Sequence, residues 1–244
     1  MSAAHTLKNT YVGMAQGLGT LLEKTGVDGA MKKREKDSRA VHWMHSLFAI
    51  HDMEKLVALD VPWWTYKAID EVSAILERTP NARVFEYGSG ASTVWLARRA
   101  ASVTSIEHHA GWHERVTEHL GTMSGLAPVD LRLVEPDRAA PDDPIYASQK
   151  SGEVGQTFEA YAKAIETSED ALFDVIVIDG RARQACLKHA VSALAPNGVI
   201  VFDNSHRKRY RRAIEDIGFD VQCHRGLTPS LPYPDETTLL FHPR

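Results

Sequence analysis

Acidic side chains follow several short apolar runs of this 244-residue chain. Glu107, Asp179 and Asp203 each come at the end of such a run, and Asn204 follows Asp203 directly. Charged groups are rarely buried without a partner, so acids at several run ends are hard to explain by packing alone. Carboxylates can accept hydrogen bonds from sugar hydroxyls, ligate a cation, or take a proton from a reacting group. The pattern therefore predicts a site at these ends.

A glycine-bearing turn lies upstream of Glu107, in the stretch ARVFEYGSGASTVWLARRAASVTSIEHH (82–109). Gly88 and Gly90 lie between a predicted strand and a predicted helix over Thr93 to Arg99, and they let the backbone approach a ligand closely. The start of the helix offers unpaired N–H groups, and Glu107 can accept hydrogen bonds from two ribose hydroxyls. Together these parts predict a nucleoside site.

Apolar runs and helical patterns alternate along the chain. The expected strands cover Val84 to Tyr87, Val103 to Ile106, Asp130 to Val134, Phe173 to Ile178, Val199 to Phe202, Phe219 to Cys223 and Thr237 to Phe241. The last two have no helix between them, so we expect antiparallel neighbours. This rhythm predicts an α/β fold: a Rossmann-like, seven-stranded, mostly parallel sheet with an antiparallel last strand and helices on both faces. Ligands of such sheets bind beyond the carboxyl ends of the strands.

We expect a helical N-terminal extension over 1–60 and one domain over 61–244. The extension shows helical patterns at Leu7 to Leu22 and at Val41 to Leu59. It is interpreted either as a segment packed on the domain or as an arm for a membrane surface or for homo-oligomerisation. The segment 136–155 is rich in proline, serine and glycine and lacks periodicity, so we expect a lid or a substrate-facing insertion.

Composition narrows the class of protein. A net charge of −4 and a pI near 6.3 argue against a nucleic-acid partner held by bulk electrostatics. Cys186 and Cys223 lack metal-ligand spacing and indicate reduced structural thiols. No run approaches a transmembrane span, and no signal-peptide pattern begins the chain. We therefore expect a cytoplasmic protein.

The turn departs from the dinucleotide fingerprint because Thr93 stands where the third glycine is expected. A pyrophosphate needs close backbone approach at the start of the helix, which this substitution disfavours. An NAD(P)-dependent oxidoreductase of Rossmann type stays as an alternative. A non-catalytic cofactor-binding module with the same fold is another.

The segments EYGSGAST, SIEHH, FDVIVIDGRAR and GVIVFDN together resemble the class I S-adenosylmethionine-dependent methyltransferases, and small-molecule O-methyltransferase-like members most closely. The resemblance covers about 62–242. It implies S-adenosylmethionine as cofactor and methyl transfer to a small-molecule acceptor, with oxygen favoured. The implied cofactor-binding residues are Glu86, Tyr87, Gly88, Ser89, Gly90, Ser92, Glu107, His108, Asp179 and Gly180. Ser92 replaces the last glycine of the fuller family motif.

The resemblance also bears on a metal. In metal-dependent O-methyltransferases, an acid after the fourth strand and an Asp-Asn after the fifth bind a divalent cation. Asp179, Asp203 and Asn204 fall at matching places and would suit Mg²⁺. The lysine base of those enzymes has no counterpart near Gly180-Arg181, so the alternative is that the carboxylates shape the pocket without a metal.

Several residues are candidates for acceptor chemistry. His206 is the first candidate for a general base because imidazole titrates near neutrality, and Asp179 is the second. Arg181 could pair with an anionic acceptor. Tyr146 and Tyr161 flank the end of the 136–155 loop and could contact the acceptor. No Asn/Asp-Pro-Pro-Tyr/Phe segment follows the fourth strand, which disfavours the protein and nucleic-acid methyltransferases that act on amino groups.

Overall fold

The computed structural model describes residues 38–50, 52–148, 150, 152–168 and 172–243, together with Gly29 and Arg34. The helical pattern expected at Leu7 to Leu22 lies outside these residues. No helix in the described part of the chain has the length and apolar composition needed to cross a bilayer.

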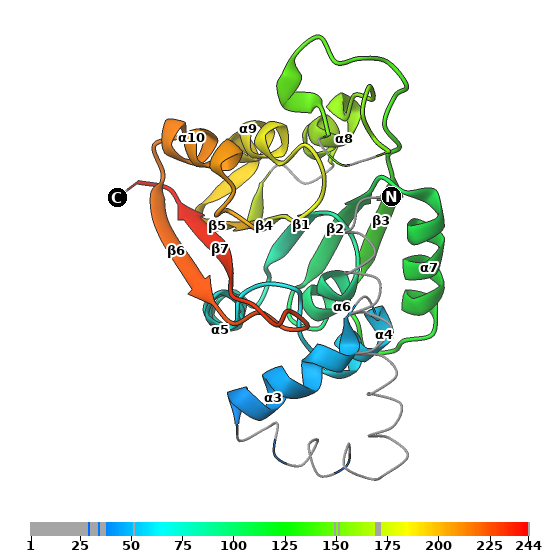
Figure 1. The fold of residues 1–244 in the computed structure, drawn as a ribbon, viewed down its shortest axis with the longest axis vertical. Coiled ribbons are helices and arrows are strands. Elements are labelled where there is room, and N and C mark those ends of the chain that lie inside the picture. The colour runs from blue at the N-terminus through cyan, green and yellow to red at the C-terminus, as the bar shows by residue number, and fades with distance from the viewer. Residues whose placement is uncertain are drawn as a thin grey trace.

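A seven-stranded sheet runs through the centre of the protein in the order β3-β2-β1-β4-β5-β7-β6 (Figure 1). Its strands are β1 (Arg83–Tyr87), β2 (Ser102–Glu107), β3 (Val129–Leu133), β4 (Phe173–Ile178), β5 (Leu194–Asp203), β6 (Asp220–Gly226) and β7 (Asp235–Phe241). The pairs from β3 through β5 are parallel, whereas β7 is antiparallel to both β5 and β6. The predicted fold is confirmed, including the antiparallel final pair.

Alternate side chains of the central strands enter two different cores, as the period of two requires. Phe85 and Tyr87 of β1 join one hydrophobic cluster, whereas Val84 joins the other. The same alternation holds in β4, where Ile176 packs on the first side and Val177 on the second. These strands are therefore buried on both faces.

Helices cover both faces of the sheet (Figure 1). On one face lie α8 (Glu159–Lys163), α9 (Arg183–Ala193) and α10 (Lys208–Asp216), and on the other α4 (Met53–Ala58), α5 (Tyr66–Arg78), α6 (Ala91–Ala97) and α7 (Ala110–Gly121). Trp64 is fully buried against Trp95 of α6, with the ring centroids 5.8 Å apart.

The pattern at Val41 to Leu59 is two helices rather than one. The first is α3 (Arg39–Ser46), which continues as a 3-10 turn over Leu47–Ala49, and the second is α4. Asp52 ends the continuity because its Oδ1 accepts the Lys55 N–H at 3.1 Å, so the side chain caps a new helix.

The described part of the extension packs on the domain. Leu56 shares a hydrophobic core with α5 and α6. The Trp43 indole N–H donates to the Leu231 carbonyl at 3.0 Å, and Ser46 Oγ accepts the Ser230 N–H at 2.9 Å. These contacts tie α3 to the loop between β6 and β7.

Candidate functional site

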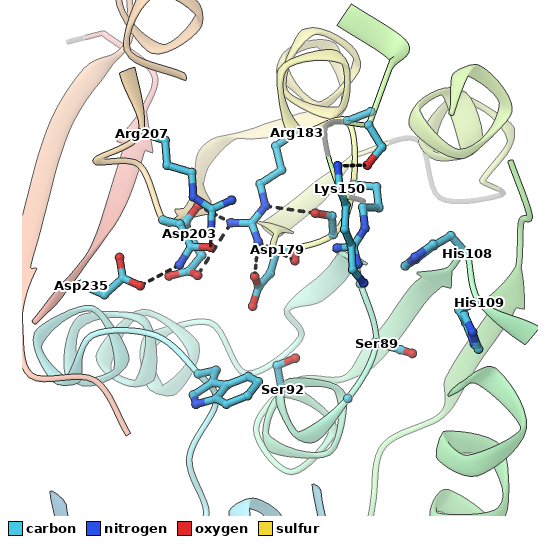
Figure 2. A pocket seen from close by; sticks show the side chains of 18 of the residues that line it. Ser89, Ser92, His108, His109, Lys150, Asp179, Arg183, Asp203, Arg207 and Asp235 are labelled. Carbon is cyan, nitrogen blue, oxygen red and sulfur yellow. Dashed lines mark hydrogen bonds and ion pairs between the residues drawn. The ribbon is translucent and has the colours of Figure 1, made fainter. Parts of the chain in front are cut away.

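A cavity of about 1480 Å³ opens beyond the carboxyl ends of the parallel strands. It lies at the switch point, where the chain leaves β1 for β2 on one side and later adds β4 on the other. Pockets for one small ligand usually measure about 300–1,000 Å³, so the volume admits two. Figure 2 shows Asp179 near its middle, with Ser89 and His108 to one side and Arg207 and Asp235 to the other.

Two glycines allow β1 and β4 to end side by side at the switch point. Gly88 has φ +97°, and a Cβ there would lie 2.9 Å from the Gly180 Cα and amide nitrogen. A Cβ on Gly180 would lie 1.9 Å from the hydroxyl oxygen of Tyr161. The backbone at the base of the cavity therefore depends on glycine at both positions.

Glu86 lies beneath the turn and does not line the cavity, contrary to its predicted cofactor contact. It is fully buried, and its carboxyl group accepts hydrogen bonds from Ser92 Oγ at 2.5 Å, Thr93 Oγ1 at 2.5 Å and Ser105 Oγ at 2.6 Å. Thr93 Oγ1 also accepts the Gly90 N–H at 2.9 Å. The threonine that breaks the dinucleotide fingerprint thus links Glu86 to the turn.

Burial raises the pKa of Glu86 from 4.5 to about 7, although the three hydroxyl donors oppose the shift. The raised pKa means that folding favours the neutral acid. This contribution is complete below pH 4.5 and is lost as the pH rises through about 7.

We expect the free energy of unfolding of the wild type to fall by about 3 kcal/mol relative to that of Glu86→Gln between pH 4.5 and 8. Glutamine cannot ionise, so the variant should lack this dependence. Urea denaturation of both proteins across this range measures the difference. If the free energies of unfolding of the wild type and of Glu86→Gln changed in parallel with pH, the raised pKa of Glu86 would be contradicted.

Glu107, at the end of β2, lines the cavity as an ionised acceptor. Its Oε2 accepts the Ser89 N–H at 3.2 Å and Ser89 Oγ at 3.0 Å, and its Oε1 accepts the N–H of His108 at 2.8 Å. Burial raises the pKa of Glu107, but His108 and the backbone donors outweigh it, so the net pKa is lowered. Trp112 Nε1 donates to the Ser89 carbonyl at 2.8 Å and holds the turn against α7.

The 136–155 segment lies along the cavity, where Pro144, Ile145, Ala147, Ser148 and Lys150 contribute to the lining. Glu153 ties this segment to Arg181, because Glu153 Oε2 lies 2.9 Å from Arg181 Nε. The other oxygen, Glu153 Oε1, lies 3.5 Å from Nε2 of His108, the residue that follows Glu107. Burial raises the pKa of Glu153, but the Ser148 hydrogen bond and the Arg181 charge give a net lowering.

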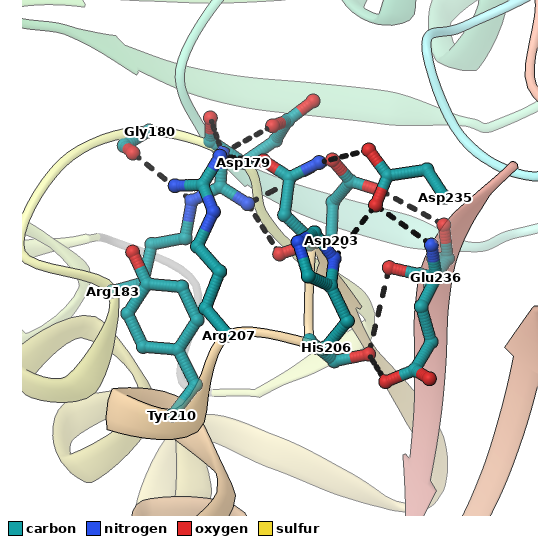
Figure 3. A network of polar contacts seen from close by, with 12 residues as sticks. Asp179, Gly180, Arg183, Asp203, His206, Arg207, Tyr210, Asp235 and Glu236 are labelled. Atoms are coloured by element: carbon teal, nitrogen blue, oxygen red, sulfur yellow. Dashed lines mark hydrogen bonds and ion pairs between the residues drawn. The ribbon is translucent and has the colours of Figure 1, made fainter. Parts of the chain in front are cut away.

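Arg183, the first residue of α9, stands between the acids at the ends of β4 and β5 (Figure 3). One guanidinium nitrogen lies 2.7 Å from Asp179 Oδ1, and another lies 3.7 Å from Asp203 Oδ2 and also donates to the Asp203 carbonyl. Burial raises the pKa of Asp179 above 3.8 despite the Arg183 charge, and burial with the Asp179 charge raises that of Asp203 well above 3.8.

The predicted Mg²⁺ ligands do not fit a divalent cation. The Arg183 guanidinium already stands between Asp179 and Asp203, and Asp203 Oδ1 accepts Thr237 Oγ1 at 2.8 Å. The Asn204 amide is engaged by Asp235 and Arg207. Among the described residues, no group of three or more His, Cys, Asp or Glu side chains could hold a metal ion.

Neither Mg²⁺ nor EDTA should change the melting temperature of the protein. A ligand that binds the folded state raises this temperature, so a magnesium site would reveal itself without a known acceptor. Differential scanning calorimetry makes the measurement. A rise with Mg²⁺ that disappears in Asp203→Asn would contradict the proposed absence of a metal.

Most of the predicted site residues meet at the cavity. Those that line it are Gly88, Ser89, Gly90, Ser92, Glu107, His108, Asp179, Gly180, Arg181, Asp203 and Asn204. Tyr87, Tyr146 and Tyr161 are instead buried in the core, where Tyr87 donates to the Ala162 carbonyl at 2.7 Å and Tyr146 lies 3.0 Å from His189 Nε2. His206 is half exposed and outside the lining, with Nδ1 2.9 Å from Asp235 Oδ1.

Sequence reasoning missed several lining residues. Ile50 and Met53 come from the extension, Arg183 and Arg207 follow strand ends by a few residues, and Asp235 begins β7. Their distance from the strand ends could have indicated the two arginines. Arg183 lies four residues after Asp179, and Arg207 lies four residues after Asp203. Nothing in the sequence placed Ile50 or Met53 at the sheet edge.

Residues 85–205 match a family described as a methyltransferase domain. The O-methyltransferase of Bacillus cereus, solved with S-adenosylhomocysteine, has a TM-score of 0.57 and 16% identity, over 78% of this chain and 90% of that one. A methyltransferase-like protein of Silicibacter pomeroyi has a TM-score of 0.48 and 21% identity, over 71% of this chain and 87% of that one. An rRNA methylase of Streptococcus thermophilus has a TM-score of 0.49 and 12% identity, over 72% of this chain and 96% of that one. No curated protein sequence matches the chain.

The sheet order, the strand-end cavity and the family match define an S-adenosylmethionine-binding, Rossmann-like methyltransferase fold. Residues 85–205 therefore belong to a methyltransferase-domain family, and the sheet has the fold of the class I S-adenosylmethionine-dependent methyltransferases. Its own residues fit that cofactor, because an ionised Glu107 and the backbone of Ser89 and Gly90 share one end of the cavity.

Proposed function

We propose that this methyltransferase transfers the methyl group to an oxygen atom of a small-molecule acceptor, without a metal. The observation that carries the proposal is the position of Asp179. Its carboxylate lies in the cavity at the switch point, with Ser89 to one side and Arg207 and Asp235 to the other (Figure 2), and residues of α4 and of the loop before β7 also line this cavity.

The end near β2 binds the cofactor in this proposal. Glu107 accepts hydrogen bonds from the ribose hydroxyls, and the backbone of Ser89 and Gly90 borders the rest of the nucleoside. Trp112 lies beside it, since a Cβ added to Gly90 would lie 3.7 Å from Trp112 Cζ2. When bound, S-adenosylmethionine supplies an electrophilic methyl group on its sulfonium.

Asp179 acts as the general base. As the bond between the acceptor oxygen and the methyl carbon would form and the bond between that carbon and the sulfonium sulfur would break, leaving S-adenosylhomocysteine, Asp179 would take the hydroxyl proton. Arg183 holds the carboxylate through its contact with Oδ1 at 2.7 Å. The raised pKa of Asp179, caused first by burial, makes it a stronger base than an exposed aspartate. The remaining contribution is positioning of donor and acceptor.

The other end suits a small molecule rather than a macromolecule. Apolar side chains of Ile50, Met53 and Leu231 line it, and Pro144 and Ile145 of the 136–155 segment border the cavity as well. The Arg181–Glu153 ion pair and the contacts between Trp43 and Leu231 fasten these walls. A confined, mostly apolar space of this kind is typical of small-ligand sites.

The test is an acceptor screen. The protein is incubated with S-adenosylmethionine carrying a ¹³C-labelled methyl group and a panel of hydroxylated, aminated and thiolated small molecules, with bulk rRNA as a further arm. Release of S-adenosylhomocysteine and mass spectrometry identify the methylated atom. We expect label on oxygen of a small molecule. Label only on nitrogen, sulfur, carbon or rRNA would refute the proposal.

A further inference from the structure

One positive charge at the acceptor end of the cavity has no carboxylate to neutralise it within the described part of the chain. Arg207, which precedes α10, is partly buried and lines the cavity. One guanidinium nitrogen donates to Asn204 Oδ1 at 3.0 Å, and its Cζ lies 6.0 Å from the Tyr210 ring centroid. Neither partner carries a negative charge.

Three other cations that line the cavity, Arg183, Arg181 and Lys150, have acidic partners, whereas Arg209 donates to the Tyr210 hydroxyl at 2.9 Å. Arg183 contacts Asp179 and Asp203, as described above. The positive charge of Arg181 is met by Glu153, which also lies 3.7 Å from Lys150 Nζ. The ion pair therefore accounts for Arg181, which the sequence suggested as a partner of an anionic acceptor.

Asn204 separates Arg207 from the nearest acid of β7. Its Oδ1 accepts from Arg207, while its Nδ2 donates to Asp235 Oδ2 at 2.9 Å. Asp235 Oδ1 lies 2.9 Å from His206 Nδ1. Asn204 has φ +52°, a conformation that asparagine tolerates better than most residues. The amide thus orients the guanidinium without cancelling its charge (Figure 3).

A guanidinium that is partly withdrawn from water is stabilised when an anion completes its hydrogen bonds, and its planar donors match carboxylate and phosphate oxygens. Tyr210, which is 6% exposed, limits the space on one side of Arg207. Apolar Leu231 and Met53 line the same cavity. A ligand for this end would therefore combine an apolar body with an anionic group.

We propose that the methyl acceptor carries a carboxylate or phosphate group and that Arg207 binds it. This inference rests on the proposed function, because it describes the acceptor of the same site. Arg207 then sets specificity: acceptors whose acidic group is replaced by a neutral amide bind more weakly.

The test uses probes rather than the unidentified acceptor. Isothermal titration of the protein saturated with S-adenosylhomocysteine measures binding of 4-hydroxybenzoate, its neutral counterpart 4-hydroxybenzamide, phenyl phosphate and phenol. The variants are Arg207→Gln, Arg207→Lys and Arg212→Gln. The last is a matched control on α10, with a side chain that is 90% exposed.

We expect the wild type to bind at least one anionic probe about tenfold or more tightly than its neutral counterpart, as for a charge-assisted hydrogen bond. Arg207→Gln should lose this preference, Arg207→Lys should keep part of it, and Arg212→Gln should keep all of it. Comparison of the carboxylate with the phosphate identifies the favoured anion.

Three results would overturn the proposal: no saturable binding of either anion, a preference that survives Arg207→Gln, or a loss of cofactor affinity in Arg207→Gln. The last would assign Arg207 to the carboxylate of the cofactor. These outcomes differ from failure of the proposed function, in which the acceptor screen would place the label only on nitrogen, sulfur, carbon or rRNA.

Discussion

Asp179→Asn is expected to lower kcat at least about 100-fold, the usual lower range for loss of a general base. Asparagine keeps the shape and can still accept the Arg183 N–H, but it cannot take the acceptor proton. Burial raises the pKa of Asp179 above 3.8, so the acid limb of the wild-type rate profile should lie higher than for an ordinary aspartate. Steady-state kinetics across pH, with an acceptor from the screen, measures both quantities.

Two controls separate catalysis from folding. Affinity for S-adenosylhomocysteine and the melting temperature of Asp179→Asn should stay close to those of the wild type. Asp216→Asn, whose side chain is 67% exposed on α10, should leave kcat unchanged. An Asp179→Asn enzyme with undiminished kcat would remove Asp179 as the base.

Gly180→Ala should destabilise the fold by about 3 kcal/mol, a typical cost of a steric clash in a packed core. The added Cβ would lie 1.9 Å from the Tyr161 hydroxyl oxygen and 3.1 Å from the Tyr87 carbonyl carbon. For a chain of this length the melting temperature should fall by about 6–12 °C. Thermal denaturation measures the shift.

Gly121→Ala is the matched control because a Cβ there would meet nothing within 4 Å, and it should keep or raise the stability. The double variant Gly180→Ala/Tyr161→Phe should recover part of the loss, since it removes the nearest clashing atom. If Gly180→Ala melted with the wild type, the close contact between Gly180 and Tyr161 would be wrong.

The fold could be predicted from the sequence because two local signals coincide. The FDVIVI run is apolar except for Asp174, as expected for a strand buried on both faces, and β4 spans the same residues, Phe173–Ile178. The sequence has no helical pattern between the last two strands, and this absence correctly predicted that they are antiparallel neighbours. The break inside 41–59 was missed because the apolar pattern continues through it, and only the Asp52 cap interrupts it.

Positions along the cavity could be predicted where the backbone itself fixes them. Gly88, Glu107 and Asp179 lie at strand ends, and parallel strands bring these ends to one edge. Glu86 was misplaced although the strand period held the answer. It shares a face with Val84, so its side chain points beneath α6 rather than beyond the strand end.

Directions of side chains in turns and loops could not be predicted. His206 lies two residues after Asn204, yet its side chain is outside the cavity lining and pairs with Asp235. Asn204 adopts φ +52°, which changes the direction of the chain before His206. Tyr146 and Tyr161 flank the long segment but pack into the core with α9. Their positions depend on contacts between segments distant in sequence.

Titration with S-adenosylhomocysteine, compared between the wild type and Glu107→Gln, tests most directly whether the end of the cavity near β2 binds the cofactor. The wild type should bind it and should not bind NADH. Glu107→Gln should bind at least about tenfold more weakly, because hydrogen bonds to a charged carboxylate are worth about 1.5–3 kcal/mol. Equal affinity of the two proteins, or binding of NADH in place of S-adenosylhomocysteine, would contradict this account.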